Sequence, residues 1–173
     1  MDAWSRISAT VVNEFSDISD LEDLTRIALR LLIAMVLGGV LGLERESAHK
    51  AAGLRTHTLV SLGSALFVLV SIEAGIEPSD LSRVVQGVVA GIGFLCAGAI
   101  LKSADQDHVR GLTTSAGLWI TAAIGLAAGL GREGVAVLST LLALGVLRLE
   151  RPVKLMMRRR QRDKAAQQRQ DAP

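Results

Sequence analysis

The chain has 173 residues, half of them hydrophobic, and a formal net charge of only +2. This length and composition favour one compact domain that lies mostly in a membrane, and we expect no nucleic-acid partner. The single cysteine, Cys96, excludes an intrachain disulfide framework and a cysteine cluster for metal.

The first 23 residues carry apolar side chains at the spacing of one helical face. These side chains are Trp4, Ile7, Val11, Phe15 and Ile18. The spacing predicts a short amphipathic helix on the membrane surface. Because the other face is acidic, we place this helix on the outer side, away from an anionic inner leaflet. The alternative is a frayed, solvated terminus.

Five apolar runs follow, and each is about long enough to cross a bilayer. They are Leu24 to Leu43, His57 to Gly75, Val84 to Leu101, Leu112 to Leu130, and Gly134 to Leu149. The first run has no basic lead and no small-residue cleavage site, which is typical of a retained span rather than a signal peptide. The sequence therefore predicts an all-α membrane protein, a compact bundle of about five transmembrane helices. Its segments are 1–23, a spanning domain at 24–149 and a basic tail at 150–173.

The charges between the runs are distributed unequally. The linkers at 44–56 and 102–111 and the tail after residue 149 are rich in lysine and arginine, whereas acidic residues dilute the cations on the opposite side. Cations are retained on the cytoplasmic side of spanning proteins. An odd number of spans then places the N-terminus outside and the C-terminal tail inside.

The third run, between Arg83 and Lys102, is rich in glycine, and small residues let helices approach closely in lipid. We expect this run to be the packing centre of the bundle. Small residues also recur at four-residue intervals in the first and fourth runs, and the fourth is the expected partner of the third. The residues expected at helix contacts are Gly38, Gly42, Gly87, Gly91, Gly93, Cys96, Gly98, Gly117, Gly125 and Gly129.

The two inner linkers end in a similar motif, Gly-Leu-x-Thr, which begins at Gly53 and again at Gly111. The offset of 58 residues covers two runs and suggests a duplicated hairpin, with a chance match as the alternative. In both places threonines stand where a helix N-cap belongs. Thr56, and Thr113 or Thr114, are therefore expected to cap the helices that follow.

Motifs of enzymes are missing from the sequence, which has no Gly-rich phosphate loop, no His-Glu metal helix and no nucleophile elbow. We expect no enzymatic activity and no cofactor, and we retain Mg²⁺ as a candidate ligand. The polar residues that stand out gather at the predicted membrane boundaries. The functional candidates are Glu44, Arg45, Arg55, Thr56, His57, Asp80, Arg83, Gln86, Arg110 and Thr114.

The candidates at the inner boundary have two interpretations. Glu44 and Arg45 are either a charged end of the first helix, where the helix dipole favours a cation, or part of a gate. In the second interpretation they form an ion-pair network with Arg55, His57 and Arg110.

The candidates at the outer boundary lie on one helical stripe. Asp80 is either an N-cap with Arg83 extending outward, or part of a mouth that gathers cations. Gln86 lies one turn into an apolar span, where an amide is expected to bond a neighbouring helix or to line a wet cavity.

Four separated stretches resemble, in order, the MgtC/SapB family of bacterial inner-membrane proteins. They are Leu41 to Glu46, Ala52 to Val60, Gly91 to Ile100, and Val109 to Thr114, followed by Leu118-Trp119 and Ala122 to Gly125. The resemblance covers about residues 30 to 150 and implies a multi-pass protein of the bacterial inner membrane, with five spans. The family motif positions are Glu44, Arg45, Gly53, Arg55, Thr56, His57, Asp80, Arg83, Gly91, Gly93, Phe94, Gly98, Arg110, Gly111, Thr114 and Trp119.

The resemblance also implies a link to magnesium limitation. Some family members are virulence factors, and one is thought to restrain the proton-translocating ATP synthase. Two features depart from the family pattern. Cys96 stands where glycine is usual, which enlarges a side chain at an expected close contact. The sequence continues for about two dozen residues after the last run, so we expect a short form without the soluble C-terminal domain of the virulence-type members.

Two function hypotheses of different classes follow. One is a regulator that binds another membrane protein, such as an ATP synthase or an ion transporter, or a second copy of itself as a homodimer. The other is a transporter or channel for Mg²⁺ or H⁺, with Asp80, Arg83 and Gln86 at the outer mouth and Glu44, Arg55 and Thr114 at the inner end. The runs carry no carboxylate at mid-span, which favours regulation.

Overall fold

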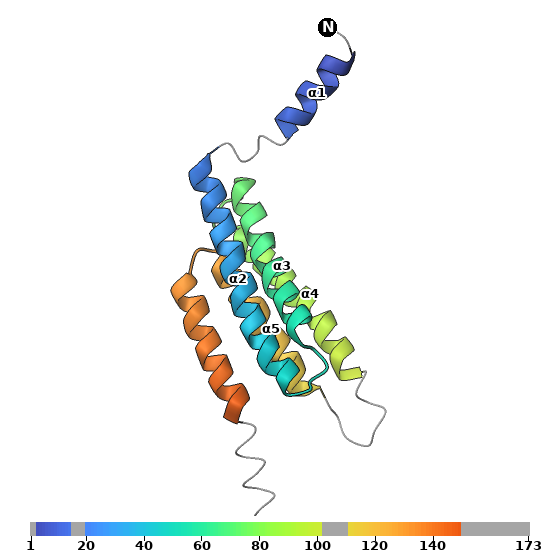
Figure 1. Cartoon of the computed structure of the whole chain (residues 1–173), viewed down its shortest axis with the longest axis vertical. Helices are drawn as coiled ribbons and strands as arrows, with labels where there is room; N and C mark the ends of the chain where they lie inside the picture. Colours follow the sequence, from blue (N-terminus) through green and yellow to red (C-terminus); the bar gives the residue numbers. More distant parts are fainter. Residues whose placement is uncertain (1–2, 15–19, 102–110, 150–173) are drawn as a thin grey trace, which may run out of the picture.

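The computed structural model describes residues 3–14, 20–101 and 111–149, and these ranges are helical apart from short turns. The labelled helices are α1 (Ala3–Glu14), α2 (Leu21–Ser47), α3 (Leu54–Glu73), α4 (Leu81–Leu101) and α5 (Leu112–Gly129). A last helical segment, here called the final helix, occupies residues 133–149. Figure 1 shows α2 to α5 and the final helix side by side, with α1 standing apart. The expected all-α bundle is confirmed.

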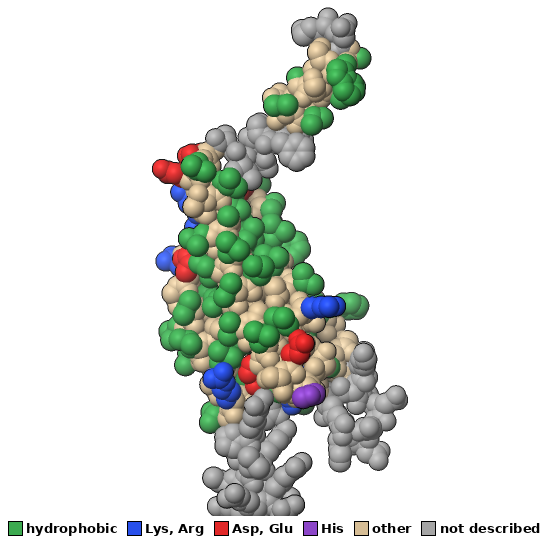
Figure 2. Space-filling view, viewed as in Figure 1, with side chains coloured by type: hydrophobic (Ala, Val, Ile, Leu, Met, Phe, Trp, Pro, Cys, Tyr) green, Lys and Arg blue, Asp and Glu red, His purple; other side chains and the backbone are tan. Residues whose placement is uncertain are grey.

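Four helices, α2 to α5, are long and apolar enough to cross a membrane. Figure 2 shows apolar side chains along most of the visible length of the bundle, as expected for a surface that meets lipid. The fifth predicted crossing, Gly134 to Leu149, is helical over 133–149, up to the edge of the described residues. The number of crossings and the orientation of the termini stay predictions.

The amphipathic segment at the N-terminus is helical, as predicted, over Ala3–Glu14. Trp4, Ile7 and Val11 are all more than half exposed, and α1 contacts none of the other described helices. Phe15 and Ile18 lie outside the described residues. The location of α1 on a membrane surface therefore stays a prediction.

Close contact between helix backbones organises the centre of the bundle, along a line that we call the seam. On α2, a Cβ added at Gly38 would lie 2.6 Å from Ser61 Cβ, and one at Gly42 would lie 2.6 Å from Leu54 Cα. On α5, a Cβ at Gly129 would lie 2.6 Å from the Ala65 carbonyl oxygen. Gly125 meets the backbone of Ser61 in the same way. These four glycines bring α2, α3 and α5 into backbone contact, so the predicted glycine-mediated packing is confirmed there.

The prediction that the third run is the packing centre is wrong. In α5, 61% of the residues in the apolar stretch are buried, against 6% in α4. Nothing in the described chain lies within 4 Å of a Cβ added at any of the four glycines predicted to pack in α4. These glycines are Gly87, Gly91, Gly93 and Gly98. Glycine permits close approach but does not by itself supply a neighbour, and the seam glycines of α2 and α5 have the neighbours that those of α4 lack.

α4 packs mainly on α5, as predicted, and only lightly on α3. Two reciprocal hydrogen bonds join the pair. The Cys96 thiol donates to the Ser115 carbonyl oxygen at 3.3 Å, and the Ser115 hydroxyl donates to the Cys96 carbonyl oxygen at 2.9 Å. Cys96 therefore occupies the expected helix contact and bonds across it.

The same pair of positions touches in both predicted hairpins. Cys96 and Ser115 lie 58 residues after Gly38 and His57, and a Cβ at Gly38 would lie 2.8 Å from the His57 carbonyl oxygen. α3 and α5 each begin directly after the glycine of the Gly-Leu-x-Thr motif. This correspondence favours the interpretation of α2–α3 and α4–α5 as copies of one hairpin.

The threonine caps predicted for α3 and α5 are wrong. The N-cap residues are Gly53 and Gly111. Glycine has no side chain that could accept a hydrogen bond from the first amides of these helices. The amide of Leu54 instead donates to the Glu46 carboxylate at 2.9 Å. A carboxylate from the end of α2 replaces the local threonine because the tight linker brings it to the start of α3.

Candidate functional site

The candidate site begins with a buried ion pair near the end of α2. Glu44 Oε2 lies 2.5 Å from Arg45 Nε, and the two residues are only 8% and 1% exposed. One of the two interpretations was a charged end of the first helix, but α2 continues to Ser47 and both residues are buried. The pair is therefore inside the bundle. An ion pair in such a place is strongly favoured over a single charge, because a lone buried charge is very costly.

His57, from the first turns of α3, lies close to this pair. Its side chain is fully buried, and its Nδ1 lies 3.1 Å from the Gly53 carbonyl oxygen. Both Arg45 and Glu44 are near enough to interact electrostatically with the ring. On the other side, a Cβ at Gly117 of α5 would lie 3.4 Å from His57 Nε2. The imidazole thus fills the space that this glycine leaves.

Three buried polar atoms in this region have no hydrogen-bond partner among the described residues. They are Glu44 Oε1, His57 Nε2 and Ser61 Oγ. Because the Gly53 carbonyl can only accept, Nδ1 of His57 carries hydrogen, and Nε2 of the neutral ring is an acceptor. The group therefore has unused capacity to accept a proton, or to bond a water molecule or a small cation. We call Glu44, Arg45, His57 and Ser61 the inner polar cluster.

The candidates at the other end of the bundle do not form an enclosed site. Asp80 Oδ1 lies 3.6 Å from Arg83 Nε, and both side chains are largely exposed. Gln86 is exposed as well, on the outside of α4. The predicted outer mouth is not closed by the described part of this chain, so its role stays a prediction.

A family model described as the MgtC family matches residues 31–156, well over half of the chain. The chain belongs to the MgtC family. The resemblance inferred from the four sequence stretches is thereby confirmed. No solved structure matches the chain.

Several curated proteins are similar to this MgtC-family chain. Protein SrpB of Synechococcus elongatus is 46% identical over 140 residues, which cover 72% of this chain and 77% of SrpB. Protein MgtC of Brucella abortus is 44% identical over 120 residues, covering 69% of this chain and 49% of that protein. The protein named "Putative magnesium transporter YhiD" of Escherichia coli is 40% identical over 129 residues, covering 69% and 58%. The chain thus spans about half the length of two of these relatives.

Thr114, at the start of α5 of this MgtC-family bundle, is buried one turn before Gly117, the glycine that meets His57. Two other motif positions at the inner end are not gathered at the inner polar cluster. Arg55 and Thr56 are exposed, and they line a groove between α3 and α4 rather than facing Glu44. The predicted network of Glu44 with Arg55 is therefore wrong for the described residues. Arg110 lies outside them.

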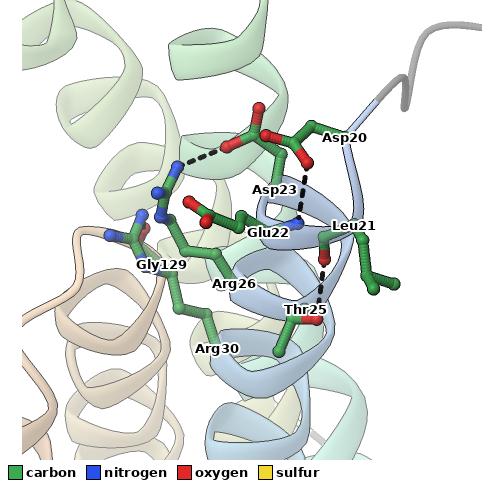
Figure 3. A network of polar contacts seen from close by, with 8 residues as sticks. All are labelled: Asp20, Leu21, Glu22, Asp23, Thr25, Arg26, Arg30 and Gly129. Atoms are coloured by element: carbon green, nitrogen blue, oxygen red, sulfur yellow. Dashed lines mark hydrogen bonds and ion pairs between the residues drawn. The ribbon is translucent and has the colours of Figure 1, made fainter.

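Arg30, a cation inside the first apolar run, was not among the predicted functional residues. Its Nη1 donates to the Gly129 carbonyl oxygen at 3.3 Å, and its Nε lies 3.9 Å from Glu133 Oε1. Figure 3 shows Arg30 reaching from α2 toward the end of α5. Gly131 has a positive φ of 70°, and its Cβ position is occupied by the Arg30 guanidinium. A charged residue within an apolar run is the signal that could have identified these contacts of Arg30.

Ser61 was also absent from the predicted functional residues, because a serine in an apolar run is only a weak indication of a functional site. Its burial depends on the approach of Gly38 from α2 and Gly125 from α5. Within the described ranges, no three side chains of the metal-binding types His, Cys, Asp and Glu come together. The inner polar cluster therefore offers single donors rather than a cage for Mg²⁺.

Proposed function

We propose that this chain is a multi-pass protein of the bacterial inner membrane, linked to magnesium homeostasis, that regulates another membrane protein by binding one of its helices. The outward face of α4 carries this proposal. Gln86 is exposed on it, Phe94 is 82% exposed, and nothing in the described chain lies within 4 Å of a Cβ at Gly93, two turns from Gln86 on the same side of the helix.

An amide that faces hydrocarbon lacks the hydrogen bonds that water or protein would supply, and this is costly. Small residues and side-chain amides are the groups through which transmembrane helices associate. A second helix laid on α4 would bond Gln86 and pack closely at Gly93. The partner classes that the family resemblance implies are an ATP synthase or an ion transporter. The alternative partner is a second copy of this chain.

The packing of the seam also supports regulation over transport. At Gly125 and Gly129, the backbones of α3 and α5 approach too closely for a water-filled passage between them. Because α5 packs tightly on α3, it is a firm support for α4, which packs on α5 and presents its other side to a partner.

The test uses a bacterium whose own MgtC-family gene has been deleted. The wild-type chain should restore growth at low magnesium, whereas Gln86→Leu and Gly93→Leu should restore it weakly at equal membrane levels. Val36→Leu is the control, because Val36 is exposed and belongs to α2 rather than to α4. A photoreactive residue at position 94 should crosslink a partner, and Gly93→Leu should abolish the crosslink. Full restoration by both variants would rule out docking on this face.

A second candidate function is movement of H⁺ or Mg²⁺, and the inner polar cluster favours it. The unbonded atoms of Glu44, His57 and Ser61 provide a place where a proton or cation could be held inside the bundle. Purified chain in liposomes should then show flux of protons or magnesium, and Glu44→Gln should abolish that flux while the protein still assembles. No flux by the wild-type protein would remove this candidate.

A further inference from the structure

The described surface contains a groove of about 710 Å³ between α3 and α4. It exists because α4 leans on α5 and touches α3 only lightly. Its floor includes Val60, Val88 and Ile92, which pack onto α5 residues. Its volume falls in the range of about 300–1,000 Å³ that is typical of ligand sites.

The lining of the groove is apolar, and several of its side chains are exposed. Leu59 and Phe67 form part of its α3 side, and both are more than 60% exposed. Gly63, Gly87 and Gly91 line it without any atom of the described chain within 4 Å of an added Cβ. Three glycines facing an empty groove leave a smooth channel that a flexible hydrocarbon chain could follow.

One end of the groove is cationic. Arg55 lines it and is exposed, and within the described residues its side chain makes no hydrogen bond or ion pair. From Arg55 to Phe67 the groove extends along about 18 Å of helix. One leaflet is about half of a hydrocarbon core that is roughly 30 Å thick. The groove therefore matches one leaflet, whereas a transmembrane partner helix would need a face that crosses both.

We propose that this groove binds an anionic phospholipid from the leaflet at the Arg55 end, with an acyl chain along Gly63, Gly87 and Gly91 and the head-group phosphate at Arg55. In the predicted topology this end is cytoplasmic, where anionic lipids are enriched. The site is distinct from the outward face of α4 and from the inner polar cluster. It holds whether the protein regulates a partner or moves an ion.

The test is native mass spectrometry of the delipidated full-length protein titrated with phosphatidylglycerol, and with phosphatidylcholine for comparison. The wild-type chain should bind phosphatidylglycerol more tightly. Arg55→Gln should weaken that binding about 5-fold, the effect of roughly 1 kcal/mol per cation near a lipid head group. Arg83→Gln, which removes an exposed cation at the other end of α4, is the matched control and should bind like the wild type.

A second variant tests the apolar part of the site independently of Arg55. Gly63→Leu should fold, because no atom of the described chain lies within 4 Å of a Cβ added there, and should weaken binding of both phospholipids. Gly145→Leu adds the same volume at another glycine with no described neighbour within 4 Å and should leave binding unchanged.

Three results would overturn the proposal. The first is equal binding of phosphatidylglycerol by the wild type, Arg55→Gln and Gly63→Leu, which would mean unspecific lipid contact. The second is binding of glycerol phosphate as tight as that of the lipid, which would mean a site for a free anion. The third is efficient disulfide crosslinking between Gly91→Cys copies in membranes, which would assign the groove to a second chain.

Discussion

Substitution of Gly125 by alanine tests the seam directly. A Cβ at this position would lie 2.8 Å from the Ser61 carbonyl carbon and 2.9 Å from Ser61 Cα, both backbone atoms. Unstrained carbon atoms stay about 3.5–4.0 Å apart. The backbones of α3 and α5 must therefore separate by about 1 Å. This movement would also loosen the contact at Gly129, one turn further along.

The expected cost follows from two opposing effects. Overpacking of a close contact destabilises proteins by typically about 1–3 kcal/mol. Alanine by itself is favoured over glycine in a helix by about 1 kcal/mol in water. Gly145→Ala isolates the second effect, because no described residue has an atom within 4 Å of a Cβ added there. We expect Gly125→Ala to be less stable than Gly145→Ala by about 1–3 kcal/mol.

Reversible unfolding in mixed micelles measures this difference. The purified chain is titrated with a denaturing detergent, and loss of helix is followed by circular dichroism. Gly125→Ala should unfold at a lower detergent fraction than Gly145→Ala. Coincident unfolding curves for the two variants would show that α3 and α5 are not in backbone contact at Gly125, and the assignment of the seam would be wrong.

The same unfolding assay tests three other contacts. Arg30→Ala should lower the free energy of unfolding by about 1–3 kcal/mol, since it removes a charged donor from the partly buried Gly129 carbonyl. An unfolding curve like that of the wild type would show that this contact does not stabilise the bundle. Ser115→Ala should lose about 1 kcal/mol, whereas Cys96→Ala should lose less because a thiol is a weak donor; the reverse order would contradict the pairing. Glu44→Leu should lower the free energy of unfolding by about 3–5 kcal/mol, because it leaves Arg45 as a lone buried charge, and the double variant with Arg45→Leu should lose distinctly less. An equal or larger loss in the double variant would show that the two charges do not depend on each other.

Much of the candidate site was recognisable in the sequence because charged and polar residues at the ends of apolar runs are conspicuous. Glu44, Arg45 and His57 were identified in this way, and the structure brings them close together. Their depth was not predictable, because α2 continues beyond the last apolar residue of its run. Ser61 joins them only through tertiary contacts, since its hydroxyl is buried by helices from elsewhere in the chain.

The sequence by itself determined that this chain is a helical membrane protein of the MgtC family, because run length, hydropathy and motif order are local properties. It also indicated glycine-mediated packing and the pairing of α4 with α5. Only the tertiary structure decided which glycines touch another helix. A glycine removes a steric barrier equally in α4 and in α5, but contact requires a neighbour, and the neighbours are set by how all the helices pack together. That is why α5, and not the glycine-rich α4, lies at the centre.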